Sequence, residues 1–172
     1  MRGLAMLSHD KLLSRLHYNP ETGVFTWLKA SLFAPYHIGC VAGCIKRRTH
    51  NCYREIVISK RVYQAHRLAF FYMIGRWPRK NMDHKDRNGL NNKWSNLREA
   101  TLSQNGANAC RYSTNTSGFK GVTFHKKCGK WQSAIKKDSK SIYIGLFDTP
   151  DAAHLAYVAK AKELFGEFAR AA

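Results

Sequence analysis

The chain has 172 residues, enough for one good hydrophobic core or for two small cores joined by a linker. A hydrophobic content of 44% with 12% aromatic residues excludes a disordered tail and is typical of a folded protein. Lysine and arginine total 29 against 11 acidic residues, giving a net charge of +18. Such a charge repels itself in a compact fold, which favours a nucleic acid partner. A solvated basic surface is the alternative.

The sequence indicates an intracellular protein without a membrane partner. It contains no apolar run of about 18 residues, and residues 1–16 carry charged side chains among their leucines, which predicts an amphipathic helix rather than a signal peptide. The cysteines are odd in number and irregularly spaced, as expected of reduced thiols packed in a core, and they are Cys40, Cys44, Cys52, Cys110 and Cys128. Zinc binding by Cys40, Cys44 and Cys52 is an alternative.

The first 64 residues are expected to form a strand-rich scaffold that could also clamp DNA. Leucine spacing predicts a helix up to Leu16 with Ser8 as its cap. Alternating apolar residues then predict strands over 23–28, 38–45 and 53–63, the last folded over a tight turn at Ser59 and Lys60. Residues 65–72 read as a buried helix that ends before Gly75.

From Asn81 to Asn105, asparagine and aspartate crowd together. This composition predicts a turn-rich loop held by hydrogen bonds from side chains to the backbone, followed by a short helix over 103–111. Residues 113–118 are a polar connector and the expected domain boundary. Beyond it we predict strands over 119–125, 131–137 and 141–147, then a helix over 150–165 with Thr149 as N-cap and Gly166 as stop.

The adjacent pair Asp83 and His84 is the candidate for chemistry. Phosphodiester hydrolysis needs a base that works near neutral pH, which imidazole supplies, and a hard divalent cation, which Asp and Asn oxygens can bind. Neighbouring side chains on a strand point to opposite sides, so both residues can face a substrate only at a bend or an edge. On residue types alone, a merely hydrogen-bonded loop explains this segment equally well.

The wider segment resembles the HNH homing endonucleases, whose fold is a ββα-metal finger of two strands and a helix. The resemblance rests on separated anchors in order, namely His66-Arg67-Leu68, Asp83-His84-Lys85-Asp86, Asn91-Asn92, Asn96-Leu97-Arg98 and Ser103-Gln104-Asn105. It implies that His84 is the general base and that Asp83 and Asn105 hold the metal. It also implies that Asn96 fixes the loop between the strands. Because Asn105 stands where a second histidine often occurs, Mg²⁺ or Mn²⁺ is expected rather than zinc.

Further residues near this segment are candidates for substrate contact. Arg67, Arg76 and Lys85 are expected to bind phosphate, with an exposed solvated face as the alternative for each. His66 lies in an apolar helix and is expected to support the active site, with a phosphate contact as its alternative. The predicted base, the predicted metal ligands and these candidate contacts all fall within the nuclease module expected over residues 65–112.

The C-terminal segment, residues 119–172, predicts a second domain, a three-stranded antiparallel sheet packed on one helix. Alternation places Trp131, Ser133 and Ile135 on one face and Gln132, Ala134 and Lys136 on the other. The segments Lys120-Gly121-Val122, Ile144-Gly145-Leu146-Phe147-Asp148-Thr149 and Asp151-Ala152-Ala153-His154-Leu155-Ala156-Tyr157 resemble the Apetala-two (ethylene-response-factor) domain, which binds DNA through its sheet. The resemblance implies DNA contacts by Lys120, Thr123, His125, Lys126, Gln132, Lys136 and Tyr143.

Together these patterns predict an α+β protein that cuts double-stranded DNA, leaving a 5′-phosphate and a 3′-hydroxyl. The expected cofactor is Mg²⁺ or Mn²⁺, with no small-molecule cofactor. No dimerisation heptad occurs, so a nicking monomer is expected, located in the host cytoplasm if a phage encodes it. A non-catalytic DNA-binding regulator that retains the HNH shell is the alternative.

Overall fold

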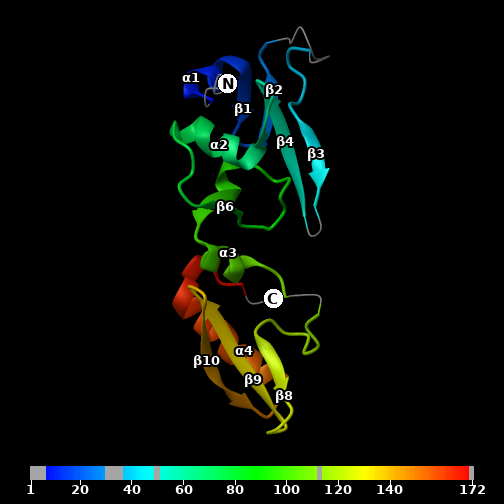
Figure 1. Ribbon diagram of the computed structural model, residues 1–172, viewed down its shortest axis with the longest axis vertical. Helices are drawn as coiled ribbons and strands as arrows, with labels where there is room; N and C mark the ends of the chain where they lie inside the picture. The colour runs from blue at the N-terminus through cyan, green and yellow to red at the C-terminus, as the bar shows by residue number, and fades with distance from the viewer. Residues whose placement is uncertain (1–6, 30–36, 49–50, 112–113, 171–172) are drawn as a thin grey trace, which may run out of the picture. The chain divides into compact units, whose positions relative to one another are not determined.

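The computed structural model describes residues 7–29, 37–48, 51–111 and 114–170. The chain divides into two compact units, Met1–Glu99 and Ala100–Ala172, each of which mixes helices with small antiparallel sheets (Figure 1). The predicted α+β class is confirmed. The predicted domain boundaries, 1–64, 65–112, a linker at 113–118 and 119–172, stay predictions, and Ser113 lies outside the described residues. No described helix is both long enough and apolar enough to cross a membrane.

The first unit begins with a short helix and a hairpin. Helix α1 (His9–Arg15) starts at Ser8, whose hydroxyl accepts a hydrogen bond from the Lys11 amide at 3.3 Å, as predicted. The backbone is already extended at Leu16, where β1 (Leu16–Asn19) begins and pairs with β2 (Val24–Trp27). The predicted helical residues before 7 lie outside the described part of the chain.

The second sheet of this unit has the strand order β3-β4-β5, formed by β3 (Cys44–Arg47), β4 (Cys52–Ile58) and β5 (Arg61–Gln64). Ser59 and Lys60 make the predicted tight turn with φ of 51° and 65°. The predicted strand over 38–45 is wrong in its first part, where a single bridge joins Val41 to Thr26. Gly43 explains this difference, because its φ is 82° and a Cβ there would collide with the Glu55 carbonyl.

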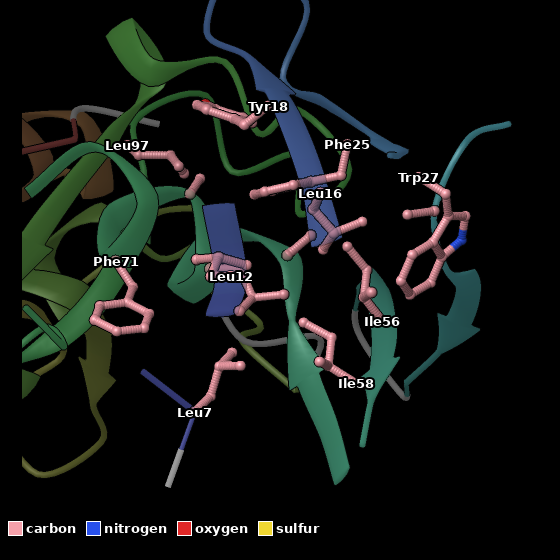
Figure 2. Packing of buried hydrophobic residues seen from close by; sticks show 14 residues of the cluster. Leu7, Leu12, Leu16, Tyr18, Phe25, Trp27, Ile56, Ile58, Phe71 and Leu97 are labelled. Atoms are coloured by element: carbon pink, nitrogen blue, oxygen red, sulfur yellow. The ribbon is translucent and has the colours of Figure 1, made fainter. Parts of the chain in front are cut away.

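Helix α2 (Ala65–Ile74) closes the core of the first unit and ends at Gly75 in the left-handed conformation. Its buried face packs with side chains of α1, the β1–β2 hairpin and β4 in one apolar cluster, in which Leu12, Leu16, Tyr18, Phe25 and Ile56 are almost fully buried (Figure 2). Each such burial stabilises the fold by about 1.5–3 kcal/mol. Residues that follow α2, such as Trp77, Met82 and Leu97, therefore pack against this core.

Strands β6 (Asn81–His84) and β7 (Leu97–Ala100) form a two-stranded sheet, separated by a polar loop and a 3₁₀ turn at Trp94–Asn96. Helix α3 (Leu102–Asn108) follows in the second unit. Its start is a capping box, in which the Thr101 hydroxyl accepts from the Gln104 amide at 3.2 Å and the Gln104 side chain accepts from the Thr101 amide at 2.8 Å. The helix predicted over 103–111 is confirmed but ends three residues early.

The second unit contains a sheet of order β10-β9-β8, made by β8 (Val122–His125), β9 (Lys130–Lys137) and β10 (Lys140–Phe147), with α4 (Pro150–Phe165) on one face and a 3₁₀ turn at Gly166–Phe168 (Figure 1). The predicted bounds and Thr149 cap of α4 are confirmed. Ile135 pairs with Ile142 and Lys136 with Ser141, so the two predicted faces are confirmed. β8 starts three residues later than predicted.

Candidate active site

Asp83 and His84 end strand β6 and turn to different partners, as neighbours on a strand must. The Asp83 carboxylate Oδ2 accepts a hydrogen bond from Arg98 Nε at 2.9 Å, and His84 Nε2 lies 3.1 Å from Asn92 Oδ1. Both residues are nearly covered, with exposed fractions of 7% and 6%. Hydrogen-bond partners and the aromatic rings beside them fill the space around both side chains, so neither lies open to a substrate in this structure.

Two aromatic side chains enclose the His84 imidazole. The His66 ring, from α2, meets it edge to face with ring centres 5.1 Å apart, and the Tyr53 ring, from β4, lies 6.2 Å away. Burial lowers the pKa of His84, although the Asn92 hydrogen bond and the nearby carboxylates oppose the shift. Burial, helped by His84 and Arg67, lowers the pKa of His66 to about 3. Both imidazoles are therefore neutral at neutral pH.

The hydrogen-bond pattern around Asn92 fixes which nitrogen of His84 carries the proton. Asn92 Nδ2 donates to the Leu90 carbonyl at 3.3 Å, so the amide oxygen is the atom that faces His84. An amide oxygen only accepts, and His84 Nε2 must therefore donate. The neutral imidazole consequently carries its proton on Nε2 and has its basic lone pair on Nδ1.

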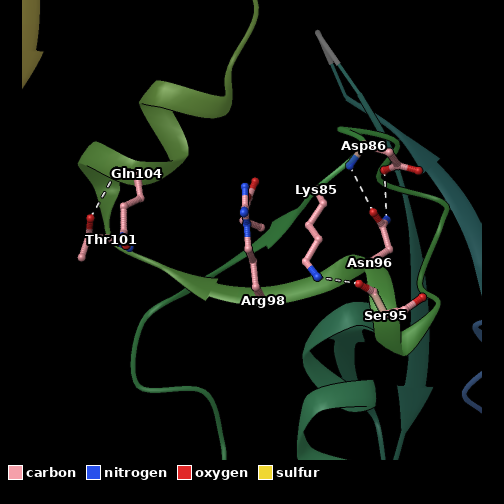
Figure 3. Close-up of polar contacts among 8 residues, drawn as sticks. Lys85, Asp86, Ser95, Asn96, Arg98, Thr101 and Gln104 are labelled. Carbon is pink, nitrogen blue, oxygen red and sulfur yellow. Dashed lines mark hydrogen bonds and ion pairs between the residues drawn. The ribbon is translucent and has the colours of Figure 1, made fainter. Parts of the chain in front are cut away.

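The loop between β6 and β7 is held by Asn96, which is 8% exposed. Its Oδ1 accepts from the Asp86 amide at 3.1 Å, and its Nδ2 donates to Asp86 Oδ1 at 2.9 Å (Figure 3). The same Nδ2 also donates to the Asn91 carbonyl at 2.8 Å. Burial alone would raise the pKa of Asp86, but hydrogen bonds from Asn91, the Asn88 amide and Asn96 outweigh it and lower the pKa below its usual value. Asn96 therefore joins Asp86 to Asn91 within the loop, and its role in the nuclease site stays a prediction.

The basic residues predicted to bind phosphate already have partners or partial cover within the first unit. Lys85 Nζ donates to the Ser95 carbonyl at 2.8 Å (Figure 3). Arg76 forms a 3.0 Å ion pair with Glu99 and lies over the Phe70 ring at 5.0 Å from its centre. Arg67 is half-buried on α2. Lys85 and Arg76 are both exposed, and the Arg76 guanidinium already pairs with the Glu99 carboxylate.

The predicted metal ligands come from the two separate units. Asp83 belongs to the first unit, whereas Asn105 is a half-buried residue of α3 in the second. The structure thus brings together Asp83, His84 and Asn96, and the pairing of Asp83 with Asn105 stays a prediction. Within the described part of the chain, no three His, Cys, Asp or Glu side chains gather as a closed metal cage.

The residues predicted to contact DNA in the second unit lie mostly on the face of the sheet opposite α4. Thr123 pairs with Gln132 and Tyr143 with Ala134, while Lys136 is exposed beside Ser141. Tyr143 is 59% exposed. His125 is half-buried at the end of β8, and Lys126 is exposed in the turn that follows.

Lys120 has a different environment from the rest of that predicted set. Its ammonium donates to the carbonyls of Gly106, Ala107 and Ala109 at 2.9, 2.6 and 2.7 Å. These carbonyls end helix α3, where a positive charge is stabilising. Lys120 therefore stabilises the fold of the second unit, and its DNA contact stays a prediction.

Asn92, Arg98 and Tyr53 contact the predicted site residues, and sequence reasoning gave none of them a role. Asn92 and Arg98 stand inside the motif anchors, but their spacing does not reveal which of several polar residues turns inward. Tyr53 comes from β4, which β5 and α2 separate from β6 in the sequence, and only the three-dimensional fold places it beside His84. A sequence signal for Tyr53 is lacking.

The sequence is similar to one known protein family and to several viral and plant proteins. A family model described as HNH endonuclease matches residues 63–107. Protein 3.8 of Escherichia phage T7 is 33% identical over 89 residues, which cover 52% of this chain and 73% of that protein. An uncharacterized HNH endonuclease of Acanthamoeba polyphaga mimivirus is 35% identical over 108 residues, or 62% of this chain and 55% of that protein.

A shorter similarity extends to plant proteins. APETALA2-like protein 2 of Oryza sativa is 45% identical over 42 residues, which are 24% of this chain and 10% of that protein. The chain thus spans about a tenth of the plant relatives and about half of the mimivirus relative. No solved structure matches. On the family model and the phage relative, the chain belongs to the HNH endonuclease family.

Proposed function

We propose that the protein is a metal-dependent endonuclease that hydrolyses phosphodiester bonds of double-stranded DNA. The observation that supports this most is the His84 imidazole, neutral, oriented by Asn92 and adjacent to Asp83, inside the segment that matches the HNH family. The net charge of +18 fits a polyanionic substrate. Family membership and chemistry therefore agree on one activity.

In this proposal His84 acts as general base through Nδ1. A neutral imidazole can accept a proton from a water molecule, and burial lowers the pKa of His84, which favours the neutral form. The water then attacks phosphorus in line with the departing 3′ oxygen, which gives a 5′-phosphate and a 3′-hydroxyl. Because His84 is only 6% exposed, DNA binding must shift the surrounding side chains enough to admit the phosphate.

A divalent cation would be held by Asp83 and Asn105. One carboxylate and one amide oxygen are hard donors, which suits Mg²⁺ or Mn²⁺ because these ions keep several water ligands and need few from protein. A bound cation would stabilise the charge that develops on the phosphate and the leaving oxygen. Arg98, at 2.9 Å from one Asp83 oxygen, orients that carboxylate from the strand opposite.

The sheet of the second unit is proposed to bind DNA. Its face opposite α4 exposes Thr123, Lys136 and Tyr143, which can donate hydrogen bonds or approach phosphate. Similarity to plant proteins, one of them named as an AP2-like ethylene-responsive transcription factor of Arabidopsis thaliana, supports this assignment. Binding by this unit would raise the local concentration of DNA at the cutting unit.

Cleavage of supercoiled plasmid tests the proposal. We expect nicked product with Mg²⁺ or Mn²⁺, none with EDTA, and a fall of about 10²–10⁴-fold in rate for His84→Ala. His17→Ala, which changes an exposed histidine of β1, is the matched control and should cut normally. Thermal melts of both variants separate loss of the base from loss of the fold. Equal rates for His84→Ala and wild type would remove His84 from the mechanism.

The enclosure of Asp83 and His84 favours one alternative, a DNA-binding protein that keeps the HNH shell without cutting. Such a protein would bind DNA in a gel-shift assay yet leave plasmid intact in Mg²⁺, Mn²⁺ and Zn²⁺. Plasmid cleavage therefore distinguishes the two candidates. If the plasmid is cut, linear rather than nicked product would indicate that the enzyme acts as a dimer.

A further inference from the structure

Asn92 links His84 to a distant part of the chain. Its side chain is 1% exposed and touches His84 Nε2 through Oδ1 at 3.1 Å. A buried amide without partners is costly, and here both ends are used, because Nδ2 donates to the Leu90 carbonyl. Asn92 therefore has one favourable orientation, and that orientation fixes the tautomer of His84.

The backbone of Asn92 is held in turn by the β1–β2 hairpin. The hydroxyl of Tyr18, a fully buried residue of β1, donates to the Asn92 carbonyl at 2.6 Å. The Trp94 amide donates to the Pro20 carbonyl at 2.9 Å in the hairpin turn. Gly23, with φ of 74°, lies so close that a Cβ there would collide with the backbone of Asn92.

We propose that Asn92 is a positioning residue for His84 and that the β1–β2 hairpin, through Tyr18, holds Asn92 in place for this role. The inference rests on the proposed nuclease function, in which His84 takes a proton from water at Nδ1. The hairpin is 65 or more residues away in sequence, yet it meets the same loop by three independent contacts. These contacts, made by Tyr18, Pro20 and Gly23, therefore help to place Asn92.

Nitrogen NMR of the metal-free protein, labelled with ¹⁵N-histidine, tests the positioning directly. At a pH where His84 is neutral, we expect Nε2 to show the shift of a protonated nitrogen and Nδ1 that of an unprotonated one. Asn92→Leu, which fills the space but cannot accept, should give a mixture of tautomers. Asn92→Asp keeps an acceptor and should keep the wild-type pattern. A wild-type protein with its proton on Nδ1 overturns the proposal.

Tyr18→Phe and Asn88→Ala complete the set. Tyr18→Phe removes only the hydroxyl that anchors Asn92, and we expect a partial mixture of His84 tautomers. Asn88→Ala removes a hydrogen bond to Leu90 in the same loop without touching His84, and it should leave the tautomer pattern unchanged. If Asn92→Leu does not fold, Tyr18→Phe still decides the question. An unaltered His84 pattern in both Asn92→Leu and Tyr18→Phe overturns the proposal.

Plasmid cleavage gives the second readout. We expect Asn92→Leu to lower kcat by about 10–100-fold with little change in KM, as is typical when the partner of an active-site imidazole is lost. Asn92→Asp should restore most of that loss. A change in KM alone contradicts a positioning role. If the tautomer responds as predicted but wild type leaves DNA uncut, the positioning of His84 stands and the nuclease function is what fails.

Discussion

The active-site loop of the first unit, residues 85–96, and the outer sheet face of the second unit use polar side chains in opposite ways. In the loop, Asp86, Asn91, Asn92 and Asn96 direct their side chains to one another, to the backbone or to His84. On the sheet face, residues such as Lys136 and Tyr143 are exposed. The loop uses its polar groups to fix geometry, and the sheet face keeps its groups available for a partner.

This difference fits the roles that we propose for the two regions. A base must meet one water and one phosphate at fixed distances, so its neighbours have to be held by buried hydrogen bonds. Affinity for DNA comes largely from accessible positive charge and tolerates looser geometry. Substitutions in the loop should therefore alter folding and rate strongly, whereas substitutions on the sheet face should alter affinity mildly.

The largest effect is expected for Asn96→Ala. Removing its side-chain amide breaks three hydrogen bonds, one with the Asp86 backbone amide, one with the Asp86 carboxylate and one with the Asn91 carbonyl. The loss leaves buried polar groups without partners. We expect the free energy of unfolding to fall by about 2–4 kcal/mol and cleavage to be lost. Urea unfolding followed by tryptophan fluorescence measures the first quantity, and plasmid cleavage the second.

Ser95→Ala is the matched control for Asn96→Ala. Ser95 is the exposed neighbour, and its contact with Lys85 uses the backbone carbonyl, which the substitution keeps. Its stability should stay within about 0.5 kcal/mol of wild type. Equal losses for the two variants would mean that the loop is not held by Asn96.

The pH dependence of stability is the next largest effect. The pKa of His66 is about 3 in the folded protein and 6.5 in an unfolded chain. Between these values the unfolded chain binds a proton that the folded protein does not. The contribution of His66 to the free energy of unfolding is therefore fully present above pH 6.5. It falls as the pH drops toward 3, by up to about 1.4 kcal/mol per pH unit.

His66→Phe should reduce this pH dependence, because it removes one titrating ring and keeps an aromatic side chain in place, while His84, whose pKa is also lowered by burial, still contributes. Urea unfolding at several pH values measures the slope for wild type and variant. His17→Phe, at an exposed position, should retain the wild-type slope. Identical slopes for wild type and His66→Phe would show that His66 does not stay neutral in the folded protein.

Much of this architecture was predictable from local patterns. The bounds of α4 follow from Thr149, Pro150 and Gly166, which mark its ends by their own chemistry. The face alternation of β9 follows from the two-residue period of a strand. The first part of the strand expected over 38–45 fails because Gly43 follows a left-handed path that the apolar pattern does not reveal.

The candidate site was predictable only in part. The motif identifies Asp83, His84 and Asn96 in sequence, because their spacing is a property of the segment itself. The contact of Asn92 with the β1–β2 hairpin and of Tyr53 with His84 depends on how remote strands pack, and no local period encodes that. The enclosure of His84 has the same origin, because the rings beside it come from α2 and β4.

A smaller effect separates the two roles considered for Lys120. Lys120→Met removes the ammonium that meets three carbonyls at the end of α3, so we expect a loss of about 1–2 kcal/mol in the free energy of unfolding and little change in DNA affinity. Lys126→Met, in an exposed turn, should lower DNA affinity and leave the free energy of unfolding nearly unchanged. Urea unfolding and fluorescence anisotropy with a DNA duplex measure both. Weaker DNA binding by a fully stable Lys120→Met would instead indicate that Lys120 contacts DNA.

The smallest effect is expected for Lys136→Ala on the outer sheet face. If Lys136 neutralises one phosphate, its loss should raise the Kd for a DNA duplex about 2–5-fold and reduce the dependence of log Kd on log salt by about one unit. Fluorescence anisotropy over a salt series measures both, with Lys162→Ala on the exposed side of α4 as the matched control. Equal salt slopes for the two variants would place the DNA elsewhere on this unit. A lower slope for Lys136→Ala alone would show that the exposed face carries charge for binding, as the comparison with the enclosed loop requires.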